Sequence, residues 1–185
     1  DLTVSHCTID LNTPIQVAGQ IYYPETIYTH PSQDIRLIKV FGANFSEYVP
    51  IIEEAMAFEE DPLMVVAGWG RTRGSQVYAT SDPNILVGYK WSGDAGQLKW
   101  GTTKIDGYSL AGIYTRFKEL GNTQSTPYEC AMALYDSGCG MYCKIDDRWF
   151  LAAIGRKVID QGFDYFRDPA SGEQDYGTLN IYLQV

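Results

Sequence analysis

Long apolar runs are absent from the sequence, which has no stretch of about 18 apolar residues that could cross a membrane as a helix. A basic patch is absent as well, because 14 Lys and Arg stand against 23 Asp and Glu and give a formal net charge of −9. This acidic balance argues against nucleic acid and anionic membrane as partners. Long helix-forming stretches are scarce, and together with 18 Gly and 14 Tyr their scarcity favours an all-β protein with many turns.

Histidine and cysteine are rare, and their small numbers limit the chemistry that the chain can perform. Only His6 and His30 are present, so a histidine that acts as general base must be one of these two. The cysteines permit two disulfides in three connectivities, and their spacing neither chooses among these nor excludes buried thiols. The four cysteines are Cys7, Cys130, Cys139 and Cys143. A zinc site would need a fourth ligand and closely spaced pairs, so we expect no metal and no cofactor.

Short apolar or alternating runs recur along the chain with turn residues between them, a pattern typical of a β-sandwich or β-barrel. The expected strands cover residues 2–7, 15–17, 21–23, 35–41, 63–67, 85–89, 98–100, 110–114, 149–154 and 179–185. Pro24 is expected to stop a strand, and 46–60 reads as helix or turn. The stretch 70–75, with two arginines and two glycines, reads as a connection between two halves.

Three residues with the chemistry of a serine hydrolase lie far apart in the sequence. His6 stands at the end of a strand-like run, Asp34 stands just ahead of another, and Ser137 lies in a tight, glycine-containing stretch. A serine hydroxyl loses its proton as it attacks, and an imidazole can accept that proton near neutral pH. A carboxylate can orient the imidazole and stabilise its charged form. We therefore take His6, Asp34 and Ser137 as a candidate catalytic triad.

The segments around these residues resemble motifs of the trypsin/chymotrypsin-like serine proteases. Thr3-Val4-Ser5-His6-Cys7 is similar to that family's histidine motif, Thr-Ala-Ala-His-Cys. Asp34-Ile35-Arg36-Leu37-Ile38-Lys39-Val40 resembles its Asp-Ile-Ala-Leu-Leu-Lys-Leu, and Ala67-Gly68-Trp69-Gly70 contains its Gly-Trp-Gly. Asp136-Ser137-Gly138, followed by residues 149–154, resembles its nucleophile loop and the next strand, and Asn180-Ile181-Tyr182 resembles its closing Gly-Val-Tyr. These features follow the family's order over nearly the whole chain.

The resemblance implies two antiparallel β-barrels of the chymotrypsin-like type, with residues 1–70 in the first barrel and 71–185 in the second. The site would lie in the cleft between the barrels. His6 would act as general base, Asp34 would orient it, and Ser137 would be the nucleophile. The implied function is a serine endopeptidase that cleaves a peptide or protein substrate. The sequence of residues 98–105 resembles that of secreted bacterial and fungal members of the family.

The same resemblance assigns the residues around the nucleophile. The backbone N–H groups of Tyr135 and Ser137 would bind the oxyanion. Ala131, with Met132 beside it, would lie at the base of the primary substrate pocket. Because neither side chain carries a charge, the resemblance favours an apolar or small substrate side chain over Lys or Arg.

Several positions depart from the family's pattern. Family members have residues upstream of this histidine motif, so the first barrel is expected to be incomplete here and completed by a separate N-terminal chain or segment. Asp136 is expected to lack the family's partner, a free N-terminus. Tyr135 replaces a glycine whose backbone angles most residues resist at a cost of about 1–3 kcal/mol. Arg156 and Lys157 replace a small polar residue and an aromatic one. These departures keep open the alternative of a catalytically impaired homologue that binds a protein partner.

Overall fold

The computed structural model describes residues 2–53, 62–79, 81–110, 112–119, 121–159, 173–175 and 179–184. The regular structure of these residues consists of β-strands in four sheets, which confirms the expected all-β fold class. None of the described residues forms a helix of the length and hydropathy that crossing a membrane requires.

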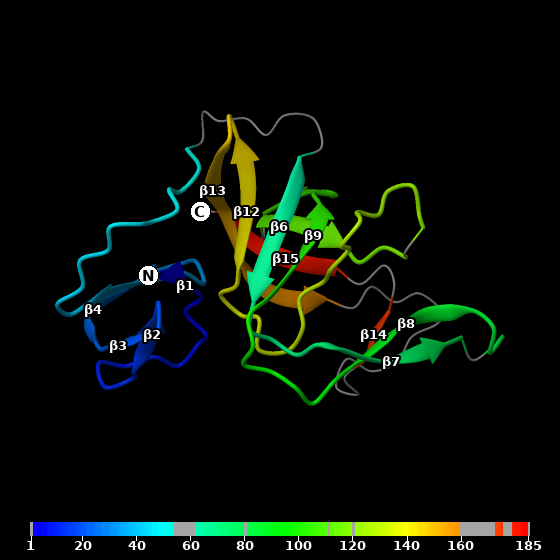
Figure 1. The fold of residues 1–185 in the computed structure, drawn as a ribbon, viewed down its shortest axis with the longest axis horizontal. Helices are drawn as coiled ribbons and strands as arrows, with labels where there is room; N and C mark the ends of the chain where they lie inside the picture. The colour runs from blue at the N-terminus through cyan, green and yellow to red at the C-terminus, as the bar shows by residue number, and fades with distance from the viewer. Residues whose placement is uncertain are drawn as a thin grey trace.

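The N-terminal part of the chain, blue in Figure 1, holds two small antiparallel sheets. Their strands are β1 (Leu2–Thr3), β2 (Ile15–Val17), β3 (Gln20–Tyr22), β4 (Pro24–Thr29) and β5 (Arg36–Val40). One sheet has the order β1-β5-β4, and the other is the β2-β3 hairpin. The two turn residues of this hairpin, Ala18 and Gly19, have φ of 50° and 80°, the positive values that a type I′ turn requires.

A seven-stranded antiparallel sheet forms the centre of the molecule, in the order β10-β11-β15-β13-β12-β6-β9. Its strands are β6 (Leu63–Gly68), β9 (Lys99–Lys104), β10 (Gly107–Ser109), β11 (Gly112–Arg116), β12 (Gly140–Ile145), β13 (Arg148–Ile159) and β15 (Leu179–Gln184). Its main core cluster includes side chains with no exposed surface, such as Met64, Met141 and Tyr182. Burial of this apolar surface is the main force that holds the sheet together.

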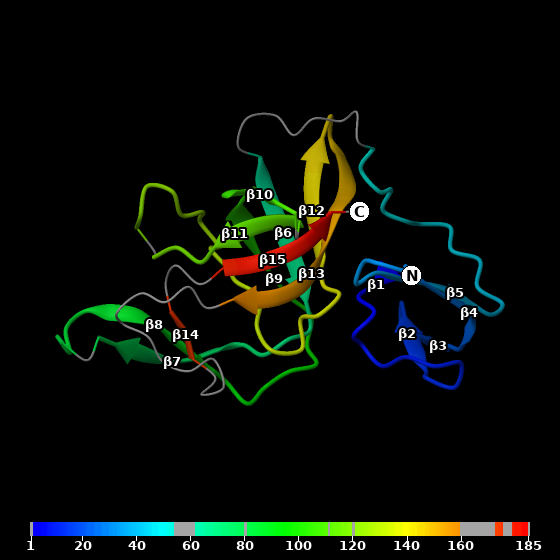
Figure 2. The ribbon, with the colours of Figure 1, turned by 180° about the vertical axis from the view of Figure 1, so that it is seen from behind.

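A third group of strands lies on the side of the large sheet opposite the N-terminal part (Figures 1 and 2). These strands are β7 (Arg73–Tyr78), β8 (Leu86–Trp91) and β14 (Glu173–Asp175), in the order β14-β8-β7. They have their own small core cluster of Val77, Ala79 and Val87.

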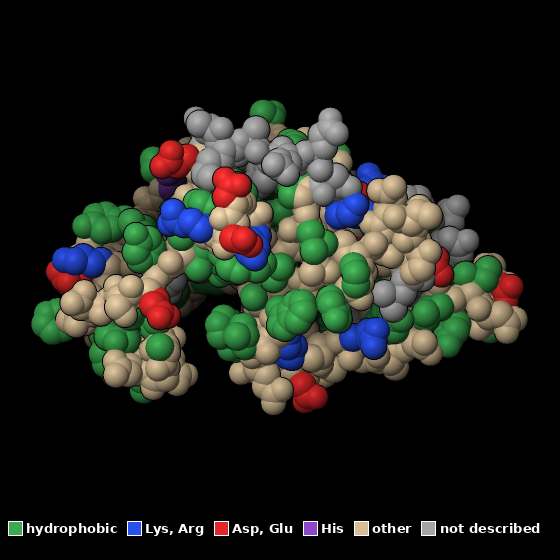
Figure 3. All heavy atoms as spheres, turned by 45° about the horizontal axis from the view of Figure 1, so that its top comes forward, with side chains coloured by type: hydrophobic (Ala, Val, Ile, Leu, Met, Phe, Trp, Pro, Cys, Tyr) green, Lys and Arg blue, Asp and Glu red, His purple; other side chains and the backbone are tan. Residues whose placement is uncertain are grey.

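The N-terminal part is fixed to the large sheet by a separate apolar cluster. Val4, which has no exposed surface, packs with Ile154 of β13 and Leu183 of β15. Further along the chain, residues 50–52 run beside β13. Ile52 N donates to Leu151 O and Leu151 N donates to Pro50 O, at 3.0 and 2.8 Å. On the face of the molecule drawn in Figure 3, a deep notch separates the N-terminal part from the rest.

The structure corrects several local expectations. β3 ends before Pro24, as expected, but Pro24 also begins β4, because the first residue of an edge strand needs no N–H for the ladder. The expected connection at 70–75 overlaps β7, which begins at Arg73. Residues 46–53 are not helical, and 54–60, the rest of the expected helix or turn, lie outside the described residues.

Two larger expectations concern how the strands are grouped. No sheet among the described residues closes into a barrel, so the expected pair of barrels is not observed as closed structures. β6 pairs with β9 and β12 of the large sheet, although it precedes the boundary expected at residue 70. The change from the N-terminal sheets to the large sheet therefore takes place before residue 63.

Candidate active site

His6 lies at the tip of a short turn that Val4 holds against the large sheet. The turn is closed by a hydrogen bond from Cys7 N to Val4 O at 3.3 Å, and Ser5 N donates to Asp34 O at 3.2 Å. Val4 is buried two residues before His6, whereas the imidazole lies at the surface with 47% of its side chain exposed.

Asp34 is bonded to this turn through both carboxylate oxygens. Its Oδ1 accepts from Ser5 Oγ at 2.6 Å and from the backbone N of His6 at 2.9 Å. Its Oδ2 lies 2.7 Å from His6 Nδ1. Burial acts to raise the pKa of Asp34, but the hydrogen bonds from Ser5 and His6 outweigh it, and the pKa lies below the usual value for an aspartate. The carboxyl group is therefore ionised at neutral pH.

Ser137 completes a line of three side chains. Its Oγ lies 2.8 Å from His6 Nε2, across 131 positions of sequence. Because an ionised carboxylate can only accept, the neutral imidazole donates its Nδ1–H to Asp34, which leaves Nε2 as an acceptor for the Ser137 hydroxyl. The structure thus brings together all three residues of the triad that the sequence indicated, in the arrangement that proton transfer from the serine requires.

The loop that carries Ser137 is held by backbone hydrogen bonds to β13. Gly138 N donates to Gly155 O at 2.8 Å, and Gly155 N donates to Cys139 O at 2.7 Å. Gly138 has a φ of 85°, and a Cβ at this position would overlap the Thr3 side chain of the N-terminal part. A glycine is therefore needed here both for the backbone angle and for the close approach of the two parts.

Tyr135 adopts the backbone angle that its residue type resists. Its φ is 77°, and Asp136 N donates to Ala133 O at 3.1 Å, as in a type II turn with Tyr135 at the position that usually holds glycine. Among the residues that the structure describes, the backbone N–H groups of Tyr135 and Ser137 donate no hydrogen bond to protein. Tyr135 therefore keeps a backbone angle that favours glycine, at the cost of local strain.

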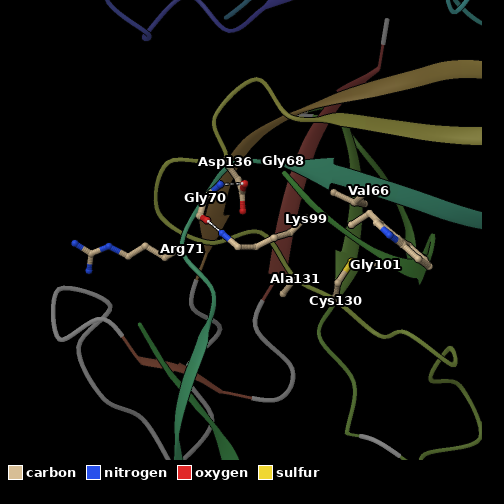
Figure 4. Close-up of a pocket in the computed structure, with 10 residues that line it drawn as sticks. Val66, Gly68, Gly70, Arg71, Lys99, Gly101, Cys130, Ala131 and Asp136 are labelled. Carbon is tan, nitrogen blue, oxygen red and sulfur yellow. Dashed lines mark hydrogen bonds between the residues drawn. The ribbon is translucent and has the colours of Figure 1, made fainter. Parts of the chain in front are cut away.

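Asp136, the residue without an identified partner in the sequence, is bonded to backbone (Figure 4). Its Oδ1 accepts from Gly70 N at 2.6 Å, and its Oδ2 accepts from Ala133 N at 2.9 Å. A Cβ at Gly68 or Gly70 would overlap this carboxylate, which explains the glycines on both sides of Trp69.

A lysine supports this arrangement from the other side of Gly70. Lys99 Nζ donates to Gly70 O at 2.9 Å, so one residue links the lysine to Asp136 (Figure 4). Burial raises the pKa of Asp136, while the two backbone donors and the charge of Lys99 act in the opposite direction. The sequence did not reveal Lys99 because the contact is made across 29 positions.

The two residues expected at the substrate pocket are placed differently. Ala131 lines a cavity of about 90 Å³ together with Lys99, Gly70 and Asp136. Met132 is buried in the main core, where its N donates to Asn180 Oδ1 at 3.0 Å. Ala131 therefore borders a cavity, whereas the Met132 side chain packs in the core.

The four cysteines are all free thiols, so of the two alternatives that the sequence left open the structure shows thiols and no disulfides. Cys139 directly precedes β12 and Cys143 lies within it, where an extended chain separates residues four apart by roughly 13 Å, too far for a disulfide. Burial raises the pKa of Cys130 to about 12 and also raises the pKa of Cys139 and Cys143. No group of three or more metal-ligating side chains occurs in the described part of the chain.

No family model matches the chain, and no curated protein matches it. Among solved structures, the chain is similar to the passenger domain of plasmid-encoded toxin, an autotransporter enterotoxin from enteroaggregative Escherichia coli. The superposition covers 100% of this chain with a TM-score of 0.56 and 12% sequence identity. It covers only 19% of the passenger-domain chain. At this identity the similarity concerns the fold alone.

Proposed function

We propose that the protein is a serine endopeptidase of the trypsin/chymotrypsin-like type, which cleaves peptide bonds through an acyl-enzyme on Ser137. The observation that carries this proposal is the continuous hydrogen-bonded line from Asp34 through His6 to Ser137, with distances of 2.7 and 2.8 Å. The sequence motifs around them supply independent support.

The proposed mechanism follows from the geometry of the three side chains. His6 Nε2 accepts the proton of Ser137 as its Oγ attacks the carbonyl carbon, and then returns it to the leaving amine. Asp34 holds the Nδ1–H and stabilises the imidazolium. The unbonded N–H groups of Tyr135 and Ser137 are the donors proposed for the oxyanion, where one such donor is worth about 2.7–4 kcal/mol. No metal or cofactor has a role in this proposal.

The proposed architecture assigns the strands to two chymotrypsin-like barrels. The small sheets of residues 2–40 belong to a partial first barrel, and the large sheet belongs to the second. An extracellular, secreted setting is proposed because the similar structure is described as an autotransporter passenger domain.

Cleavage of a mixed peptide substrate, followed by mass spectrometry, tests the proposal. The wild-type protein should cleave peptides, and Ser137→Ala should lower the rate by about 10⁴-fold or more. Ser75→Ala, a matched change at an exposed serine in β7, should leave the rate unchanged. Cleavage that survives Ser137→Ala would show that another group is the nucleophile.

A binding module that retains the fold but has lost activity is the second candidate. Two observations favour it: the strained backbone of Tyr135, and large apolar side chains exposed on the N-terminal part and the segment after it. Ile21, Phe41 and Tyr48 are 64%, 72% and 81% exposed, and exposed apolar surface of this kind is common at protein interfaces. A folded protein that cleaves no peptide would favour this function.

A further inference from the structure

Strand β13 contains an irregularity at Arg156, next to Asp34 of the candidate triad. Gly155 pairs with Tyr182 and Lys157 pairs with Ile181, so Arg156 is an extra residue on β13 with no partner of its own in β15. Such a β-bulge changes the direction of the side chain at the extra position. Here the side chain of Arg156 reaches across to the N-terminal part of the molecule.

The guanidinium of Arg156 contacts the same carboxylate oxygen that His6 uses. Its Nε lies 3.7 Å from Asp34 Oδ2, and His6 Nδ1 lies 2.7 Å from that oxygen. The separation of Arg156 Nε from His6 Nδ1 is therefore at most the sum of these two distances. The Arg156 side chain is 32% exposed, so its charge is only partly screened by water.

We propose that Arg156 is a positioning residue that shares Asp34 with His6 and thereby sets the pH range over which His6 can act as a base. The proposal deepens the proposed function, since it concerns the regulation of the same site. One carboxylate faces two cations whenever His6 is protonated. The fixed charge of Arg156 offsets part of the negative field of Asp34 and makes the imidazolium less favourable than it would be beside Asp34 alone.

The other ionisable groups near the pair do not supply this effect. Cys7 is uncharged at neutral pH because burial raises its pKa. Arg36 of β5 donates instead to the backbone O of Cys7 at 3.1 Å. Asp136 is bonded to Gly70 and Ala133 on the opposite side of the nucleophile loop. Arg156 is the cation that the structure places on the carboxylate itself.

The hollow beside the ion pair makes the effect sensitive to salt. Asp34 and Arg156 line a cavity of about 460 Å³ together with Leu110 and Leu183. Salt ions that enter from solvent screen charges over about 10 Å at 0.1 M and about 3 Å at 1 M. The influence of Arg156 on His6 should therefore weaken as the salt concentration rises.

The test is an NMR titration of the two imidazole rings in the full chain, with the His6 signals assigned by comparison with a His30→Gln variant. Arg156→Gln should raise the titration midpoint of His6 by about half a unit to one unit, because it removes a cation beside the imidazolium. Arg156→Lys, which keeps the charge, should restore the wild-type midpoint. The difference between wild type and Arg156→Gln should shrink in 1 M NaCl.

Two controls separate this effect from a general change in charge or fold. Lys157→Gln removes a cation from the next position of β13 and should leave the His6 midpoint unchanged. His30, whose Nδ1 accepts from the backbone N of Gln33 at 2.9 Å, should not move in any Arg156 variant. If Arg156→Gln does not fold, Arg156→Ser removes the same charge and tests the same expectation.

An unchanged or lowered His6 midpoint in Arg156→Gln would overturn the inference, as would an equal shift in Lys157→Gln. The titration needs no catalytic turnover, so it can succeed even when the peptide-cleavage test fails. In an active enzyme, the midpoint of the rate against pH should move upward in Arg156→Gln together with the NMR midpoint. Failure of the titration with intact cleavage would overturn the role of Arg156 alone.

Discussion

Val4→Ala is expected to uncouple the candidate site from the large sheet. Val4 lies two residues before His6 in the sequence. It has no exposed surface and packs with Ile154 and Leu183. The change removes two carbons that fill this contact, at about 0.8 kcal/mol each, and leaves a small cavity. The free energy of unfolding should fall by about 2 kcal/mol. The position of His6 relative to Ser137 should also become less well defined.

Val77→Ala is the matched control for this change. Val77 is 3% exposed and lies in the separate cluster of β7 and β8, so the same two carbons are lost away from the site. Urea unfolding should show a similar loss of stability for both variants. Labelling of Ser137 by a fluorophosphonate under native conditions should fall several-fold in Val4→Ala only. Equal labelling of the two variants would refute the reasoning that Val4 positions His6.

Two further predictions follow from the pKa directions and the cysteines. Asp34 has a lowered pKa when folded, so its carboxylate stabilises the fold above about pH 4, and this contribution is lost as the pH falls through the folded value. Asp34→Asn should therefore be less stable than wild type at pH 7 by urea unfolding, and the difference should shrink as the pH falls below about 4; a constant difference would contradict this. Denaturation with iodoacetamide and no reductant should add four adducts to the intact mass, whereas two disulfides would leave none.

The sequence was most informative where local pattern decides structure or chemistry. The alternating run at 35–41 became β5 (Arg36–Val40), and the apolar run at 63–67 became β6 (Leu63–Gly68). His6 and Ser137 were identified because their side-chain chemistry is visible in the residue type and the flanking motif. Ser5 was missed as a partner of Asp34, although a hydroxyl beside the histidine was a signal that could have indicated it.

The sequence was less informative where long-range contacts decide. β12 (Gly140–Ile145) begins with a glycine directly after the nucleophile loop, and its own sequence does not indicate a strand. Its pairing with β6 makes it one. The bulge at Arg156 is a matter of register between two strands, which no local pattern encodes. The link from Lys99 through Gly70 to Asp136 depends on the approach of three separate segments.

Tyr135 shows how a general rule can mislead at a single position. A glycine is preferred where φ is positive because it has no Cβ, so the sequence does not indicate that a tyrosine keeps this angle. The surrounding contacts, including the bond from Asp136 N to Ala133 O, instead hold Tyr135 at a φ of 77°. Non-glycine residues adopt such angles when the neighbouring structure outweighs a cost of about 1–3 kcal/mol.

The most direct test of the central claim is covalent modification of Ser137 by a fluorophosphonate, mapped by peptide mass spectrometry. The account predicts one adduct per chain, located on Ser137, and a large loss of the labelling rate in His6→Gln, because the imidazole must accept the serine proton. The labelling rate should rise with pH through the range in which an imidazole titrates. A folded wild-type protein that stays unlabelled, or equal labelling of wild type and His6→Gln, would contradict it.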